Sequence, residues 1–210
     1  MKKVFAIAAI AAAALFAGNT VNAQLGINVG YAPQTYNTNY TSGSVSTSNT
    51  AEMNGLFAGV NYNTELTGDL ALSLGVQYRL NTKETSNTTL GVTTTTKDNQ
   101  SLIDVPILFN YGINLTDDFK VSVFLGPTVS YALSGSTENT VGSVAVTTDW
   151  YNENEGNMSA LDMSLTAGAC LTFSDFRLFG GYNMGLLNLS KTDNTTMKGS
   201  NIFVGLGYNL

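Results

Sequence analysis

The 210-residue sequence lacks histidine altogether, contains one cysteine and three prolines, and has charge on only 11% of its residues. The missing histidine excludes Ser-His-Asp hydrolysis, histidine general bases and histidine-ligated metals. The single cysteine, Cys170, cannot form an internal disulfide, so the fold must be stable without one. These absences argue against an enzyme, and the sequence calls for no cofactor.

The sequence contains only nine Lys and Arg residues, and two of them lie at the N-terminus. Lys2 and Lys3 precede an apolar run that ends at Ala17, and small residues follow up to Ala23. This pattern predicts a cleaved signal peptide over 1–23, because the run is shorter than the ~20 residues that a membrane-spanning helix needs. The mature chain, 24–210, then has seven Lys and Arg against 15 Asp and Glu, a net charge of −8. Without a basic stripe, we expect no nucleic-acid partner.

The mature chain shows apolar residues at every second position, which is the signature of β-strands. Short connections alternate with long ones rich in Thr, Ser, Asn and Gly, at about 34–53, 81–101, 134–159 and 188–199, some of which we expect to continue as β-hairpins. An even number of antiparallel strands with short turns at one end and long loops at the other is typical of an outer-membrane barrel. The predicted fold is all-β, an eight-stranded antiparallel up-and-down transmembrane barrel, with strands near 24–33, 54–63, 70–80, 102–112, 119–133, 160–173, 176–187 and 200–210.

Periodicity alone does not decide whether the apolar face points into the barrel or out of it. One face of each segment carries large apolar residues, such as Leu74 and Val123, and the other carries glycines and small polar residues. An eight-stranded barrel is only just wide enough inside for its own side chains, so the large apolar set must point outward. Hydrocarbon is the solvent that tolerates such a surface.

Aromatic residues on the apolar face support this orientation. They gather near the short-turn ends of the strands and again towards the long-loop ends, as two membrane interfaces favour. The two expected girdles are Tyr62, Tyr111, Phe119, Phe173, Phe176 and Tyr208, and Tyr31, Tyr78 and Tyr131.

Several strand motifs resemble the small eight-stranded outer-membrane β-barrel proteins of the OmpA-like and PorT-like kind. The stretches that carry the likeness are IDVPILF at 103–109, FLGPTVSY at 124–131, GGYNMGLLNL at 180–189 and VGLGYNL at 204–210. The resemblance implies a location in the cell outer membrane, with outer-membrane lipid as surroundings. It also implies biogenesis with periplasmic chaperones and the barrel-assembly machinery, whose signal Tyr208 and Leu210 resemble.

Five charged residues fall on the inward face of their strands. Arg79 and Asp104 lie on neighbouring segments and are expected to pair, whereas Lys120 and Arg177 lie near the short turns. An Arg or Lys at mid-membrane on the lipid face would cost roughly 2–4 kcal/mol. We therefore expect a charge network filling a closed lumen, made of Arg79, Asp104, Lys120, Asp162 and Arg177. Asp117, Asp118 or Asp175 could partner Lys120 and Arg177, and an ion path is the alternative.

The longest connection holds the only Trp of the chain next to several carboxylates. This segment is a candidate recognition tip, and a loose Ca²⁺ site is a second interpretation because hard cations prefer clustered carboxylates. The candidate residues are Asp149, Trp150, Tyr151, Glu153 and Glu155.

The sequence thus predicts a non-catalytic outer-membrane protein that acts as a structural and surface-interaction protein through long polar extracellular loops. The alternatives are a narrow pore for ions or small solutes, a barrel subunit of a secretion assembly, and a soluble periplasmic carrier with its apolar face inward. An extracellular or secretion-system protein is the expected partner.

Overall fold

The computed structural model describes residues 23–43, 45–89, 91–116, 118–152 and 156–210. The predicted signal peptide, apart from Ala23, lies outside these residues. No helix of the described chain is long and apolar enough to cross a membrane. The strands are β1 (Ala23–Tyr31), β2 (Gln34–Ser42), β3 (Val45–Thr67), β4 (Leu70–Thr89), β5 (Val92–Asn114), β6 (Phe119–Val141), β7 (Val144–Asp149), β8 (Leu161–Phe173), β9 (Phe176–Gly185) and β10 (Thr195–Asn209).

The sheet closes on itself through β1 and β2, which together serve as one strand. Both pair with β3 on one side and with β10 on the other. From β3 the ring continues through β4, β5, β6, β8 and β9 to β10, which pairs with β1 and β2 and closes it. The strand is interrupted at Ala32–Pro33, where proline has no N–H to donate to a ladder. Counted this way, the described part of the chain forms a barrel of eight antiparallel strands, as predicted. Among the described strands, β7 stands outside the ring and pairs with β6 alone.

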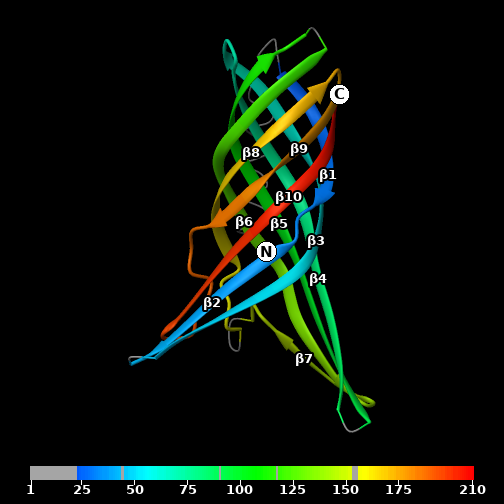
Figure 1. The fold of residues 1–210 in the computed structure, drawn as a ribbon, viewed down its shortest axis with the longest axis vertical. Coiled ribbons are helices and arrows are strands. Elements are labelled where there is room, and N and C mark those ends of the chain that lie inside the picture. The colour runs from blue at the N-terminus through cyan, green and yellow to red at the C-terminus, as the bar shows by residue number, and fades with distance from the viewer. Residues whose placement is uncertain (1–22, 44, 90, 117, 153–155) are drawn as a thin grey trace.

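The long connections are more ordered than expected. The 34–53 connection is mostly a hairpin of β2 with the start of β3, and the 81–101 connection is a hairpin of β4 and β5. Because β3 and β4 pair only from Asn54 and Thr82 onward, the sheet splits there into two arms that splay apart at the bottom of Figure 1. We call them arm A (34–53 with 195–201) and arm B (82–101 with 134–149). The predicted extension of strands as hairpins is therefore confirmed. Six of the eight predicted strand ends at these loops were too short, and those at 160 and 187 were one and two residues too long.

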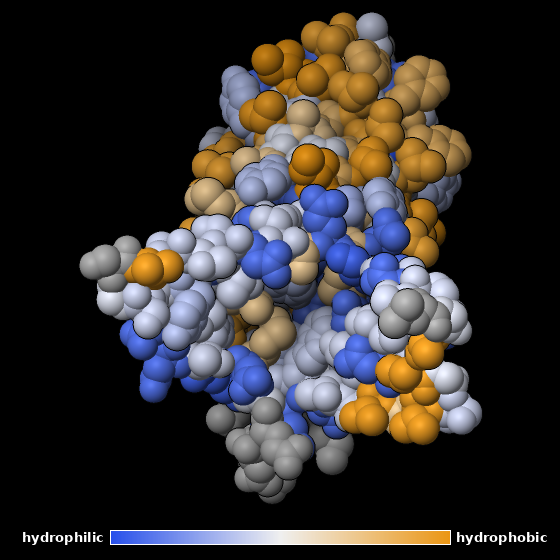
Figure 2. Space-filling view, turned by 60° about the horizontal axis from the view of Figure 1, so that its bottom comes forward, coloured by the Kyte–Doolittle hydropathy of each residue, from blue (hydrophilic) through white to orange (hydrophobic). Residues whose placement is uncertain are grey.

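The outer face of the barrel is apolar, as the sequence argument required. Val123 exposes 57% of its surface and Leu206 61%, although both lie within paired strands of the barrel wall. Figure 2 shows apolar residues covering the barrel wall above the polar arms. Aromatic residues of the outer face form two groups, with Phe173 and Phe176 at the short-turn end and Tyr31 and Tyr78 where the arms begin. Such a band matches a hydrocarbon layer with an interface on each side.

The interior is not only glycine and ions, which is a correction to the sequence interpretation. Phe57 and Phe124 are buried inside, and ring contacts of 6.2–6.4 Å connect Phe57 to Phe179, Phe179 to Phe203, and Phe203 to Phe124. We call these four rings the phenylalanine row.

Each ring of the phenylalanine row lies over a glycine directly opposite on a neighbouring strand. The pairs are Phe57 with Gly30, Phe124 with Gly168, Phe179 with Gly205 and Phe203 with Gly181. A Cβ on Gly205 would come within 2.5 Å of the Phe179 ring, so an alanine there would have to displace it. The lumen thus accommodates large rings only because the facing strand contributes no side chain.

The outward orientation of β6 gives a direct test on adjacent residues. Val123→Arg puts a charge on the lipid face, where it costs roughly 2–4 kcal/mol near mid-membrane, and should impair insertion into lipid vesicles. Ser122→Thr adds one methyl group to an inward side chain that borders a cavity and should insert normally. The measurement is the folded fraction after refolding into vesicles, read by heat-modifiable gel mobility. Equal insertion of both variants would mean that the orientation of β6 is wrong.

Candidate functional site

The inward charges Arg79 on β4 and Asp104 on β5 form a buried ion pair. Arg79 Nε donates to Asp104 Oδ2 at 2.9 Å and Arg79 Nη2 donates to Asp104 Oδ1 at 3.2 Å. Both side chains are over 90% buried. The two parallel bonds match the planar fork of a guanidinium to a carboxylate, which is the strong form of this interaction.

Neutral amides extend the pair across the bore. Arg79 Nη1 donates to Gln34 Oε1 at 2.5 Å, and Asn201 Nδ2 donates to the same oxygen at 3.3 Å. Asn183 Nδ2 in turn donates to Asn201 Oδ1 at 2.9 Å. Five strands, β4, β5, β2, β10 and β9, thus contribute to one polar layer. The sequence interpretation missed the amides because it looked for charge and left Gln34 in a loop.

A second polar layer lies closer to the arms than the first. Tyr36 Oη and Asn81 Nδ2 each donate to Gln100 Oε1 at 2.8 Å, and Gln100 Nε2 donates to Tyr151 Oη. Asn81 is fully buried. A small apolar cluster of Tyr36, Met53, Met158 and Leu189 closes this end of the lumen.

The segment that holds Trp150 and Tyr151 folds back over the barrel mouth. Trp150 N donates to Gly135 O at 2.9 Å, and its indole Nε1 donates to Thr137 Oγ1 at 2.9 Å. Both aromatic side chains are half-buried and pack against the apolar cluster, so they form a cap and not an exposed tip, which corrects the expectation for these two residues. Asp149 is exposed at the end of β7, and Glu153 and Glu155 lie outside the described residues.

No hydrogen bond or ion pair joins Asp162, Lys120 or Arg177 to the buried pair in the described chain, although Asp162 lies close enough to interact electrostatically with Arg79 and Asp104. Asp162 is half-buried at the start of β8, where its Oδ1 accepts from Met163 N at 2.7 Å. Arg177 Nη2 donates to Asn28 Oδ1 at 2.7 Å and to Asn61 Oδ1 at 2.6 Å.

The structure therefore separates the five charges that the sequence grouped into one network. Neither Lys120 nor Arg177 forms an ion pair with a carboxylate of the described chain, Asp118 and Asp175 included, and Asp117 lies outside it. Arg79 with Asp104 belongs to the polar layer near the arms, and Lys120 with Arg177 to the short-turn half of the lumen.

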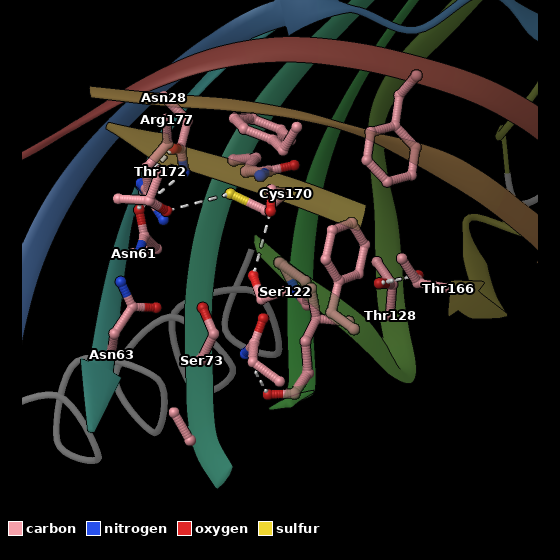
Figure 3. A pocket seen from close by; sticks show the side chains of 18 of the residues that line it. Asn28, Asn61, Asn63, Ser73, Ser122, Thr128, Thr166, Cys170, Thr172 and Arg177 are labelled. Carbon is pink, nitrogen blue, oxygen red and sulfur yellow. Dashed lines mark hydrogen bonds between the residues drawn. The ribbon is translucent and has the colours of Figure 1, made fainter. Parts of the chain in front are cut away.

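A cavity of about 570 Å³ occupies the short-turn half of the lumen, which we call the chamber. Polar side chains from β1, β3, β6, β8 and β9 point into it, and Figure 3 shows Asn61, Ser122, Cys170 and Arg177 among them. The phenylalanine row and the Arg79–Asp104 pair border its other end. Cys170 is buried on the inner face of β8, and nothing in the sequence indicated empty space beside it.

Within the described ranges, no group of three or more acidic or cysteine side chains is placed to hold a metal ion. The Ca²⁺ interpretation depended on Glu153 and Glu155, which those ranges do not include.

Comparison with known proteins agrees with this architecture. The family described as outer membrane protein beta-barrel domain matches residues 16–191. The chain belongs to this family. It is accordingly an integral protein of the cell outer membrane, with its short turns on the periplasmic side and its arms on the outside. No curated protein matches the chain in sequence.

Solved structures of several outer-membrane barrels are similar to it. The attachment invasion locus protein Ail of Yersinia pestis is 16% identical, with 90% of this chain and 100% of that chain covered and a TM-score of 0.39. Neisserial surface protein A is 12% identical over 90% and 99% of the two chains, with a TM-score of 0.45. The outer-membrane protease OmpT of Escherichia coli is 9% identical over 91% and 99%, with a TM-score of 0.45. An attachment invasion locus protein, a surface protein and a protease thus stand side by side, so these likenesses decide nothing about activity.

The buried ion pair predicts a large asymmetry between two charge-removing substitutions. Asp104→Ala leaves Arg79 charged, buried and unpaired, and should lower the free energy of unfolding by about 3–5 kcal/mol. The matched control is Glu84→Gln. It removes the partner of Lys97 in an exposed pair, whose Lys97 Nζ and Glu84 Oε2 are 3.7 Å apart, and should lower the free energy of unfolding by less than about 1 kcal/mol. Urea titration in lipid vesicles measures both. Losses of equal size would show that Arg79 is not isolated from water.

The cap should loosen in alkali. Tyr36 and Tyr151 lie beyond the Tyr31 girdle, and burial raises the pKa of Tyr36 well above its usual 10 and the pKa of Tyr151 to about 12. Below pH 10 both phenols are protonated whether the cap is closed or open. As pH rises from ~10 to ~12, an open cap ionises its tyrosines and a closed one does not, so opening is favoured.

Fluorescence of Trp150, which contacts Tyr151 edge-on, reports this opening because the chain has no other tryptophan. The signal should change between pH 10 and pH 12 in the wild type and stay flat in the double variant Tyr36→Phe with Tyr151→Phe. A wild-type signal that is flat over this interval would contradict the burial of these phenols.

Proposed function

We propose that the protein is a non-catalytic outer-membrane anchor that contacts partners outside the cell through its two arms. The observation that carries the proposal is the continuation of paired strands beyond the girdle as ordered arms with apolar tips, above a lumen that is filled at that end. Loops held by a rigid scaffold are where binding surfaces are usually found.

The tip of arm B supports the proposal through one face of its sheet. Val144 lies directly opposite Val141, and Val146 lies two residues along the same strand. The pairing of Thr94 with Val141 places Val92 on that face too. All four valines are exposed, between 48% and 65%. We call them the valine face. A contiguous apolar patch in water, such as the one at the arm B tip in Figure 2, is a common mark of an interaction surface.

The edge of β7 adds a second feature to the same arm. Every residue of β7 is exposed, and the strand pairs with β6 on one side only among the described strands. Its free edge carries unpaired backbone groups that an extended segment of another protein can join as an additional strand. The valine face and this edge together favour a protein partner.

The side chains that fill the lumen near the arms argue against the alternative function, a narrow pore for ions or small solutes. Between the chamber and the outside lie the layer around Arg79 and the layer around Gln100, both of buried and hydrogen-bonded side chains. Eight strands also leave no aqueous channel by geometry alone. In planar bilayers we expect no steady conductance from the wild type, and steady channels would contradict the proposal.

Site-specific photocrosslinking on living cells tests the contact directly. A benzoylphenylalanine placed at Val144 should give a discrete adduct, because it stands on the valine face. The matched control is Ala145, the next residue of β7, which points to the opposite face of the same sheet. Val146→Thr, which keeps the side-chain shape, should weaken the adduct at Val144. Absence of an adduct at Val144 would overturn the proposal.

The identity of the crosslinked protein separates the remaining alternatives. A component of the same cell's envelope would indicate membership of a secretion assembly, and an extracellular protein would indicate surface contact. For biogenesis, we further propose recognition of β10 by the barrel-assembly machinery, which is supported by the outward position of both Tyr208 and Leu210.

A further inference from the structure

The chamber is a blind compartment that opens on the periplasmic side. Its lining reaches Glu65 and Asp69 beside the β3–β4 turn and stops at the phenylalanine row and the Arg79 layer. Its volume of about 570 Å³ lies within the range of pockets that hold small molecules, roughly 300–1,000 Å³. Apart from Asn201, neither the arms nor the cap contributes to its lining, so it is separate from the valine face proposed above.

Arg177 lies against the chamber wall in a cradle of glycines. A Cβ on Gly26 would come within 2.8 Å of Arg177 Nη2, and a Cβ on Gly207 within 2.9 Å of the same atom. The side chain therefore lies flat over β1 and β10, where only glycine leaves room for it. Its position is built into the facing strands and is not that of a freely moving surface arginine.

No carboxylate of the described residues forms an ion pair with Arg177. Its hydrogen bonds go to the amide oxygens of Asn28 and Asn61, which are neutral, and Figure 3 shows all three side chains together at one side of the chamber. Cations withdrawn from bulk water are normally paired with an anion. The carboxylate of Asp104, which also borders the chamber, is already engaged by Arg79.

Two donors beside this cation lack acceptors. Arg177 Nε and Asn61 Nδ2 are buried without a hydrogen-bond partner, and Asn61 as a whole is only 4% exposed. Unsatisfied buried donors are rare, and each one calls for an explanation such as a ligand or an ordered ion. Asn28 Nδ2 donates to Asn61 Oδ1 at 2.9 Å and so fixes which way the Asn61 amide faces.

The remaining charges favour an anion as well. Lys120 adds a second positive charge to the lining. The carboxylates of Glu65 and Asp69 stand at the exposed mouth, where water and salt screen them. On the opposite side the phenylalanine row supplies an apolar surface. The chamber thus combines a cationic wall with an aromatic one.

From this geometry we infer that the chamber binds a small amphiphilic anion from the periplasm, with a carboxylate or phosphate group at Arg177 and an apolar body on the phenylalanine row. The anionic group receives charge-assisted hydrogen bonds from the guanidinium, which are about twice as strong as neutral ones. A ligand without charge leaves the arginine unpaired, and a ligand without an apolar part leaves the row in contact with water.

The native Cys170 allows a test on the intact protein. It borders the chamber, its Sγ lies 3.7 Å from Thr172 Oγ1, and no other cysteine exists in the sequence. Two methanethiosulfonates of similar size, one with a sulfonatoethyl and one with a trimethylammonioethyl group, are compared by their rates of modification in lipid nanodiscs. The anionic reagent should react faster, and Arg177→Gln should lower the anionic-to-cationic rate ratio about tenfold or more, as expected for one partly desolvated charge.

The rate ratio cancels any change in the reactivity of the thiol itself. Lys97→Gln, a charge-removing control on arm B, should leave the ratio unchanged. No modification by either reagent, or a faster cationic reagent in the wild type, would overturn the inference.

Protection by defined probes tests the ligand class without any substitution. Hexanoate and hexyl phosphate should each slow modification of Cys170 in the wild type, and hexylammonium and inorganic phosphate should do so less. Protection by the phosphate ester alone points to a lipid-headgroup or phosphate source, and protection by both points to a general anion site. Equal protection by hexylammonium, or none by either anion, would refute the amphiphilic anion. Conductance and crosslinking at the arms are unaffected by these outcomes, so the two proposals fail separately.

Discussion

The requirement that every backbone N–H and C=O within hydrocarbon find a partner inside the protein shapes the whole molecule. A sheet meets it only by closing, because an open edge would leave a row of unpaired groups in lipid. Here closure comes from β1 and β2, which share β3 and β10 as neighbours on either side of the break at Pro33. Outside the membrane the same requirement no longer holds, since water can pair with free groups. The sheet accordingly splits into arms and tolerates the free edge of β7 at that level.

Closure with eight strands fixes the space inside, and the chain fills it in two ways. Near mid-barrel each phenylalanine of the row lies opposite a glycine on the neighbouring strand. Because glycine has no side chain, it leaves the space that the ring occupies. Towards the arms the filling is polar, and Arg79 satisfies Asp104 and Gln34 at once. A polar filling is stable only when each member is paired. The deep layers pair the charge of Arg79 with Asp104, although Asn81 Oδ1 and Asn183 Oδ1 have no hydrogen-bond partner. In the chamber, Arg177 has only neutral partners among the described residues.

Strand number, sidedness and the outward aromatic girdles could be predicted from sequence because they rest on a period of two and on barrel volume. The pairing of Arg79 with Asp104 followed from inward parity on adjacent strands. The Gln34–Asn201–Asn183 chain did not, since neutral amides are common in polar loops and nothing marks those that will be buried. The inward phenylalanines were overlooked because large apolar residues were assigned outward as a class. Their signal, a Phe at inward parity opposite a Gly, appears only once the register is known.

The lengths of the connections explain why one end of the lumen is sealed and the other is open. At the periplasmic end the two-residue turns Gly68–Asp69 and Ser174–Asp175 and the four-residue connection at 115–118 join neighbouring strands directly and are too short to reach across the bore. At the outer end the connection between β7 and β8 is long enough to lay Trp150 and Met158 over the mouth, where backbone bonds to Gly135 and to the β9–β10 connection hold it. Solutes can therefore exchange with the chamber from the periplasm only, while the arms meet only the outside. A contact at the arms and a ligand in the chamber would act on opposite sides of the membrane, and the buried layers around Arg79 and Gln100 are the structural element that both ends share.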